Sequence, residues 1–252
     1  MRLEGALTPD WPVGPRVGAL MTTRAGGVSA RPYDSLNLGR SSGDDPDAVA
    51  ENRRRFEAAL GVPTVYLSQV HGTRVLRLPT PATGAEQADA VITTEPGVAC
   101  SVMVADCLPV LLAAPDALGV GAAHAGWRGL AAGVLEASVA ALCEAASCAP
   151  RELVVWLGPC IGPRQFEVGA DVLAAFERTA ADPGPRFVAR PRPDGAPRWR
   201  ADLPGLARDR LIALGLTQVS GGAWCSVEDA SRFFSFRRDG VTGRMAAAVW
   251  LR

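Results

Sequence analysis

The hydrophobic positions of the chain fall into short apolar runs bounded by Gly, Pro and Asp, and the densest runs lie in the centre. "GVACSVMVADC", "PVLLAAP" and "LGVGAAH" follow one another between Gly97 and His124. Runs of this length with such boundaries are typical of buried β-strands. "RVGALM", "ELVVWLG" and "RMAAAVWLR" predict further strands, and "TVYLSQVHGTRVLRL" predicts two strand pieces around His71 and Gly72.

Helical patterns lie between these strands. "DDPDAVAENRRRFEAALG" predicts a helix that Asp47 caps and Gly61 ends. "VGADVLAAFERTA" and "DLPGLARDRLIALG" predict two more, the second with Pro204 near its start. "WRGLAAGVLEASVAALCEAAS" predicts one long helix, whose i, i+4, i+7, i+11 spacing gives a buried face of Leu130, Val134, Ala137 and Ala141.

The irregular order of strands and helices indicates an α+β or layered α/β fold. Residues 182–200 are rich in Pro and Arg, and we expect a loop there rather than a linker, because strand-like and helical patterns resume without a change in composition. No repeat of fixed period is evident. We therefore expect residues 1–252 to form a single domain.

Composition narrows the class of protein. The formal net charge is zero, which argues against an electrostatic binder of nucleic acid or of anionic membranes. The beginning of the chain lacks a signal-peptide pattern, and Asp, Pro and Gly interrupt every apolar run before a bilayer-spanning length. We expect a soluble, cytoplasmic protein. All 26 basic residues are arginine, so any bound anion would be held by arginine, backbone N–H groups or a metal.

Candidate chemistry centres on the only two histidines, His71 and His124, and on Cys107. Each histidine lies at a predicted strand end beside small residues, and Cys107 follows Asp106 at the end of another strand. Two kinds of site use these residue types. One is a Cys–His nucleophilic hydrolase. The other is a metal site with two His and one Cys ligands and an open fourth position.

A helix is predicted to begin just after His124, near Trp127 or Arg128. A helix N-terminus offers free N–H groups to an anion, and Arg128 would add a positive charge. The small residues Ala125, Gly126 and Gly129 would let a ligand approach the backbone. An equally simple interpretation is that this segment only starts a helix, with Trp127 packed into the core.

Many motifs of the chain, taken in order, resemble the YfiH-like family, which is also described as laccase-domain or polyphenol oxidoreductase proteins. They include "TTRAGGVS", "SLNLG", "SQVHGTRV", "ADAVITTEPGVA", "VADCLPVLL", "AAHAGWRG", "WLGPCIGPRQFEVG" and "FFSFRRDGVTGRMAAAVWL". The resemblance runs nearly from end to end.

This resemblance implies a fold, a metal site and an activity. The fold is an α+β, αββα four-layer sandwich with mixed β-sheets, related to a cysteine-hydrolase-like superfamily. The family's ligands carry over to His71, Cys107 and His124, with zinc as the expected metal and copper as the second option. The implied activities are phosphorolysis of purine nucleosides (adenosine, inosine, guanosine and methylthioadenosine) and adenosine deamination. The partners would be a purine nucleoside and phosphate.

Binding residues are predicted around this site. Arg24 and Arg128 are anion candidates, and Asn37, Gln69, Asp89 and Asp106 are candidates for contacts to ribose or base, although Asn and Asp also commonly satisfy backbone groups in turns. Other residues of the family motifs are expected to be structural or solvated: Cys160 in a tight turn, and Arg237, Arg238 and Arg244 in a solvated charged turn. The alternative for these three arginines is closure over an anionic ligand.

Three alternatives remain open from the sequence. A laccase-type multicopper cluster needs more than two histidines, but a single-copper polyphenol oxidase does not. A cysteine hydrolase acting on a cell-wall amide would use Cys107, with His124 as the base and His71 or Asp106 to orient it. A structural zinc site would need a fourth protein ligand such as Asp106. The sequence is silent on oligomeric state.

Overall fold

The computed structural model describes residues 3–79 and 86–252. Its strands form two large sheets and one small sheet. The four-stranded sheet has the order β1-β13-β5-β2 and the six-stranded sheet the order β12-β8-β6-β7-β4-β3. The bounds of these strands are β1 Val17–Met21, β2 Thr64–Val65, β3 Val75–Leu78, β4 Ala90–Thr93, β5 Ala99–Val104, β6 Leu108–Ala113, β7 Val120–Ala125, β8 Val154–Leu157, β12 Gln218–Gly221 and β13 Met245–Leu251.

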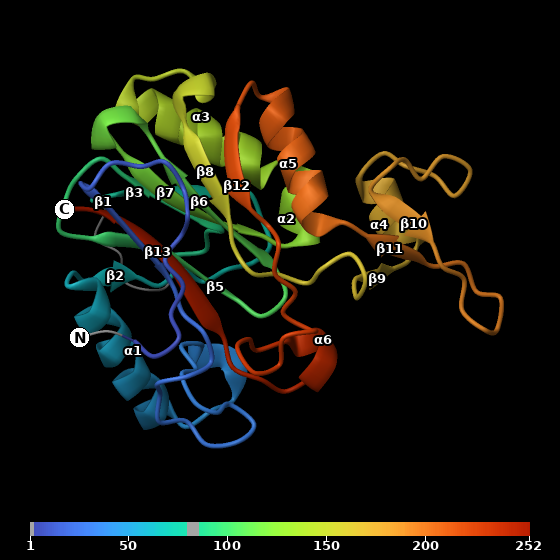
Figure 1. The fold of residues 1–252 in the computed structure, drawn as a ribbon, viewed down its shortest axis with the longest axis horizontal. Helices are drawn as coiled ribbons and strands as arrows, with labels where there is room; N and C mark the ends of the chain where they lie inside the picture. The colour runs from blue at the N-terminus through green and yellow to red at the C-terminus, as the bar shows by residue number, and fades with distance from the viewer. Residues whose placement is uncertain (1–2, 80–85) are drawn as a thin grey trace.

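Helices cover the outer faces of both large sheets (Figure 1). Their bounds are α1 Pro46–Leu60, α2 Trp127–Ala132, α3 Val134–Ala146, α4 Ala170–Ala175, α5 Leu203–Ala213 and α6 Phe236–Asp239, with short 3-10 turns at Arg40–Ser42, Pro115–Ala117 and Pro150–Glu152. Apolar side chains of α3 and α5 share one core with the six-stranded sheet. Phe56 and Leu60 of α1 share another with the four-stranded sheet.

The two large sheets pack face to face. Their inner side chains, among them Met21, Val102, Leu111 and Trp156, form a third apolar core. Both sheets mix parallel and antiparallel pairs: β13 runs antiparallel to β5, whereas β2 runs parallel to it. The four layers are therefore helix, sheet, sheet, helix, and the expected αββα sandwich is confirmed.

A smaller unit lies beside these layers (Figure 1). It consists of α4 and the sheet β10-β11-β9, with bounds β9 Glu167–Val168, β10 Phe187–Ala189 and β11 Trp199–Ala201. The prediction of a loop over residues 182–200 is wrong in part, because β10 and the start of β11 pair there as antiparallel strands. Phe187 and Trp199 are buried in the core shared with α5, which explains the pairing despite the Pro-rich sequence.

Three further sequence predictions need correction. The helix predicted from Trp127 onward is two helices, because Gly133 adopts φ 100° and ψ 31° and ends α2 before α3 begins. Its buried face is offset from the predicted one: Leu130 and Val134 are buried, whereas Ala137 and Ala141 are only half-buried. Asp45, rather than Asp47, caps α1, and its carboxylate accepts the Asp47 N–H.

Within the described residues, no helix is both long enough and apolar enough to cross a bilayer.

Candidate metal centre

Two turns and the end of one strand bring His71, Cys107 and His124 together. His71 lies in the turn between β2 and β3, Cys107 in the turn between β5 and β6, and His124 near the end of β7. Strand pairing fixes two of them, because β6 and β7 are in register with Pro109 opposite His124. The turn after β5 therefore places Cys107 close to the end of β7.

The ligand atoms of the three residues all lie within 4.8 Å of one another. Sγ of Cys107 is 3.6 Å from Nε2 of His71. The two imidazole rings meet edge to face, with their centroids 4.8 Å apart. His124 is buried, Cys107 is half-buried and His71 is exposed. The cluster thus has one side in the protein core and one side open to solvent.

Asp89 lies behind the cluster and is fully buried. One of its carboxylate oxygens lies 2.8 Å from Nδ1 of His124. The same carboxylate accepts the backbone N–H groups of Val70, His71 and Gly72, at 3.1, 2.9 and 2.7 Å. Asp89 therefore fixes both histidines: it holds the ring of His124, leaving Nε2 free for a metal, and it holds the backbone turn that carries His71.

Glycine is required next to the cluster. A Cβ atom on Gly126 would lie 2.7 Å from Cδ2 of His71 and 2.9 Å from Sγ of Cys107. A Cβ atom on Gly129, one turn into α2, would lie 3.0 Å from the carbonyl oxygen of Gly72. The start of α2 thus packs directly against the metal ligands, and this is why the segment after His124 contains such small residues.

The electrostatics of the cluster favour a thiolate beside an imidazolium when no metal is bound. Burial on its own would raise the pKa of the Cys107 thiol, but His124 and His71 outweigh it and lower that pKa to about 6. Burial alone would lower the pKa of His124, but Cys107 and Asp89 outweigh it and raise that pKa to about 9. The hydrogen bonds and the charge of His124 hold the pKa of Asp89 below its usual value, although burial opposes them.

The residues present fit a divalent metal. Two imidazoles and a thiolate are the ligand types that zinc and copper prefer, and Asp89 supplies the carboxylate that commonly supports a ligating histidine. Among the described residues, Asp106 adds no fourth ligand. Its carboxylate accepts the Ser226 hydroxyl and the backbone N–H of Arg237, each at 2.6 Å. A three-ligand cluster leaves a coordination position for another molecule.

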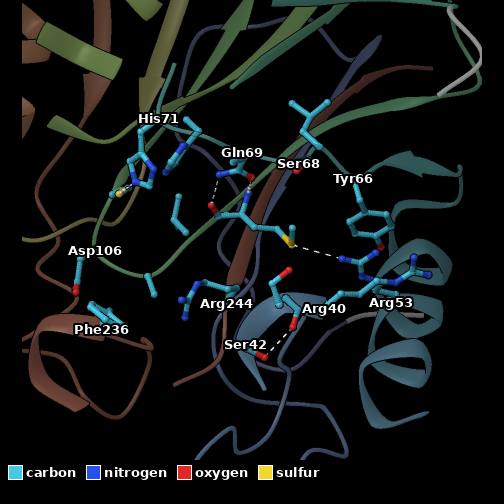
Figure 2. A pocket seen from close by; sticks show the side chains of 18 of the residues that line it. Arg40, Ser42, Arg53, Tyr66, Ser68, Gln69, His71, Asp106, Phe236 and Arg244 are labelled. Atoms are coloured by element: carbon cyan, nitrogen blue, oxygen red, sulfur yellow. Dashed lines mark hydrogen bonds between the residues drawn. The ribbon is translucent and has the colours of Figure 1, made fainter. Parts of the chain in front are cut away.

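The cluster lies at one end of a cavity of about 1150 Å³. Figure 2 shows His71 at one side of the view and Tyr66 and Arg53 at the other, with Arg244 and Arg40 between them. The cavity lining includes the metal-ligand cluster, Gln69, Asp106 and Phe236, together with the arginines Arg40, Arg53, Arg54, Arg128, Arg237 and Arg244. The cavity is large enough for a nucleoside and a second small substrate.

Two of the four predicted substrate-binding residues line the cavity, and two are absent from its described lining. Gln69 and Arg128 line the cavity, whereas Arg24 and Asn37 are not among the described residues that line it. The amide of Gln69 is committed to the backbone of Met103, donating to its carbonyl and accepting its N–H, both at 2.8 Å. Arg128 stacks over the ring of Trp127 at 4.3 Å.

Arg24 and Asn37 instead support the scaffold. Arg24 donates to the carbonyls of Asp34 and Ala230 and forms an ion pair with Asp34. Asn37 is fully buried, and its amide oxygen accepts the backbone N–H groups of Gly39 and Arg244. These contacts give each residue a structural reason to be present. Any contact with substrate stays a prediction.

Cys160 is fully buried. It pairs with Cys225 through an isolated β-bridge, and burial holds the pKa of its thiol far above the usual value. This environment is that of an inert thiol, as the sequence suggested.

Sequence analysis predicted no role for three cavity residues: Arg40, Arg53 and Tyr66. A signal for Arg53 was present, because it shares the helical spacing of Val49, Phe56 and Leu60 and therefore lies on the buried face of α1. An arginine on such a face is unusual. Arg244 was expected in a solvated turn, but it is half-buried and lines the cavity.

Comparison with known proteins identifies the family. A model of the family described as "Multi-copper polyphenol oxidoreductase laccase" matches residues 18–252. A Pseudomonas aeruginosa protein named purine nucleoside phosphorylase is 50% identical over 246 residues, which cover 98% of each chain. The purine nucleoside phosphorylase YfiH of Escherichia coli (strain K12) is 46% identical over 247 residues, which cover 97% of this chain and 98% of that one.

Solved structures agree with this result. The crystal structure of a Neisseria meningitidis protein is similar with a TM-score of 0.89 and 45% identity, covering 98% of this chain and 99% of that one. The structure of YlmD from Geobacillus stearothermophilus is similar with a TM-score of 0.84 and 33% identity, covering 94% of this chain and 93% of that one. The chain therefore belongs to the YfiH-like family, whose family model carries the description polyphenol oxidoreductase laccase.

Proposed function

We propose that this protein is a metal-dependent purine nucleoside phosphorylase that also deaminates adenosine, with zinc held by His71, Cys107 and His124. The observation that carries the proposal is the three-ligand cluster, supported by Asp89 and open to a large cavity. The names of the relatives from Pseudomonas aeruginosa and Escherichia coli support the choice of reaction. The nucleosides we expect are adenosine, inosine, guanosine and methylthioadenosine.

The number of ligands argues for a catalytic rather than a structural metal. Structural zinc sites are normally closed by four protein ligands, whereas catalytic sites keep one position open. Within the described part of the chain, the cluster consists of three ligands, and the carboxylate of Asp106 is used elsewhere. When bound there, a divalent metal would supply Lewis-acid polarisation of an oxygen on substrate or water.

The protein's own residues would perform the remaining tasks. Asp89 would hold His124 in one orientation and tautomer throughout turnover. The exposed side of His71 and the half-buried Cys107 would face the cavity, where substrate enters. The arginines of the lining would bind and orient phosphate, because guanidinium groups match the geometry of phosphate oxygens. Positioning of the two substrates against each other would supply much of the rate enhancement.

A specific observation also supports a second candidate, a metal-free cysteine hydrolase. Cys107, His124 and Asp89 form a nucleophile, base and orienting carboxylate in the order that such enzymes use. The orienting group would be Asp89, rather than the His71 or Asp106 suggested by the sequence. A single-copper oxidase is a weaker candidate, and with two histidines in the chain a multicopper cluster has too few ligands.

Product analysis separates these candidates. Purified protein of known metal content is incubated with adenosine, with and without phosphate, before and after chelation, and the products are separated by chromatography. The proposal predicts adenine only when phosphate is present, inosine without that requirement, and loss of both products on chelation. Adenine or inosine that still forms after chelation would contradict the dependence on a metal. If neither product forms on metal-loaded protein, the nucleoside activity is wrong.

A further inference from the structure

The part of the cavity beyond the metal ligands carries positive charge without an ion-pair partner among the described residues. We call this region the arginine end and define it by Arg40, Arg53, Arg244 and Tyr66, which all line the cavity. Among the described residues, no carboxylate forms an ion pair with any of these three arginines. The neighbouring Arg54 does have a partner, because Glu51 accepts two hydrogen bonds from it.

Among the residues of the arginine end, Arg53 gives the strongest indication of an anion site. Only 8% of its surface is exposed, which is rare for an arginine without an ion pair. Its Nε donates to the carbonyl of Leu38 at 2.9 Å, one terminal nitrogen contacts Sδ of Met103, and the guanidinium stacks over the ring of Tyr66 at 3.7 Å. A guanidinium has five donors, and within the described residues these contacts occupy two of them. The rest remain available to a ligand in the cavity.

The surroundings offset this charge only in part. Glu57, a helical turn beyond Arg53, is the acidic side chain among the described residues that line this end, and its charge favours the charged guanidinium, but the two form no ion pair. Burial lowers the pKa of Arg53 to about 10, so the group stays charged at neutral pH. Burial, and then the nearby carboxylate of Glu57, raise the pKa of the Tyr66 hydroxyl, so this group faces an acceptor of its own. The buried guanidinium of Arg53 keeps a desolvation cost that an anion would reduce.

Arg244 extends the positive charge towards the metal ligands. Its terminal nitrogen donates to the carbonyls of Thr242 and Gly243, which fixes the side chain. Gly39 makes room for it, since a Cβ atom there would lie 2.6 Å from Cγ of Arg244. Figure 2 shows Arg244 between His71 and the pair formed by Arg53 and Tyr66. The arginine end thus faces the same space as the metal cluster.

Arg53 and the metal ligands are linked through one short segment of the chain. Met103, which contacts Arg53, precedes Cys107 by four residues, so the Cα atoms of Met103 and Cys107 lie at most roughly 13 Å apart. Arg128 also lines the cavity, and its guanidinium stacks on Trp127 at the start of a helix of six residues.

We propose that Arg40, Arg53 and Arg244 bind a phosphate group in the part of the cavity that lies between the metal ligands and the ring of Tyr66. Several arginines suit a phosphate dianion better than a singly charged carboxylate, because each can donate paired hydrogen bonds to its oxygens. The phosphate is either inorganic phosphate or the 5′-phosphate of a nucleotide. The first alternative rests on the proposed phosphorylase function, whereas the site itself does not.

Binding measurements test this proposal without requiring turnover. Metal-loaded protein is titrated in a calorimeter at constant ionic strength with inorganic phosphate, with AMP and with adenosine. The variants are Arg53→Gln and Arg40→Gln; the second removes an exposed side chain, so it keeps the test valid if the first does not fold. Arg55→Gln is the control, because Arg55 lies on the same helix, pairs with Glu51 and is not among the described lining residues.

We expect the Kd of phosphate or AMP to rise about tenfold or more in Arg53→Gln and Arg40→Gln, with adenosine binding unchanged. If the variants bind inorganic phosphate more weakly, the arginines form the site of the co-substrate. If they bind only AMP more weakly, the arginines form a site for the 5′-phosphate of a nucleotide. The proposal is overturned if the wild type binds neither, or if both folded variants bind both ligands as the wild type does. Binding without metal-dependent adenine formation would instead contradict only the proposed function.

Discussion

At the scale of single residues, the site depends on a few buried contacts that orient the three ligands. Asp89 holds the ring of His124 and the turn of His71 at the same time. Its pattern in the sequence, "QADAV", gives no indication of this role, because the residues it contacts come from distant parts of the chain. The sequence placed Asp89 near the site but not behind the ligands.

Asp89→Asn is expected to weaken metal binding about 10- to 100-fold, because the amide cannot accept the hydrogen bonds of His124 and of three backbone N–H groups equally well. Competition with a chelator of known affinity measures the change. Asp10→Asn, which alters an exposed aspartate, serves as the control. An Asp89→Asn protein with unchanged metal affinity would contradict the orienting role.

Gly126→Ala is expected to reduce metal affinity at least tenfold, because the added methyl group would overlap His71 and Cys107. Gly14→Ala is the matched control, since a Cβ atom there meets no atom within 4 Å. Metal content after dialysis and the melting temperature of both variants check this expectation. Equal metal content in the two variants would mean that the ligands can move aside at little cost.

The thiol of Cys107 should react as a thiolate near neutral pH when no metal is bound. Its pKa is lowered to about 6, so its alkylation rate should rise through pH 6 and level off above pH 7, whereas an ordinary thiol would still be mostly protonated there. Cys143 gives an internal comparison, because burial raises the pKa of its thiol to about 12. Iodoacetamide labelling and peptide mapping measure both rates. Zinc should protect Cys107, and an alkylation midpoint above pH 8 would contradict the pairing with His124.

At the scale of elements, the apolar runs predicted the strands well, because buried strands produce a local pattern that can be read from composition and length. The predicted strands at "SVMV", "VLLA" and "GAAH" are β5, β6 and β7. The helical periodicity gave a wrong prediction where the backbone conformation of a single residue ends a helix. Gly133 lies within an uninterrupted helical pattern, yet its left-handed conformation separates α2 from α3.

Gly133→Ala is therefore expected to destabilise the fold by about 1 to 2 kcal/mol, because residues with a Cβ atom rarely adopt this conformation. Thermal unfolding, with Gly14→Ala as the comparison, measures the loss. If Gly133→Ala melted at the wild-type temperature, the break between α2 and α3 would not be fixed by the glycine.

At the scale of the whole molecule, the four layers bring together turns that are far apart in the sequence. The ends of β5 and β7, the turn before β3 and the start of α2 meet at one end of the cavity, and α1 contributes Arg53 to the other. The family resemblance predicted the layered fold and the three ligands. It could not predict the cavity's arginine end, because this depends on how α1 packs against Tyr66 and Met103.

The central claim is that His71, Cys107 and His124 hold the metal on which phosphorolysis depends. The most direct test measures bound zinc and phosphate-dependent adenine formation together, in the wild type, Cys107→Ala, His124→Ala and Cys160→Ser. We expect about one zinc per wild-type chain, and loss of both zinc and activity in Cys107→Ala and His124→Ala. Cys160→Ser should keep both. Full metal content and turnover in Cys107→Ala would contradict the account.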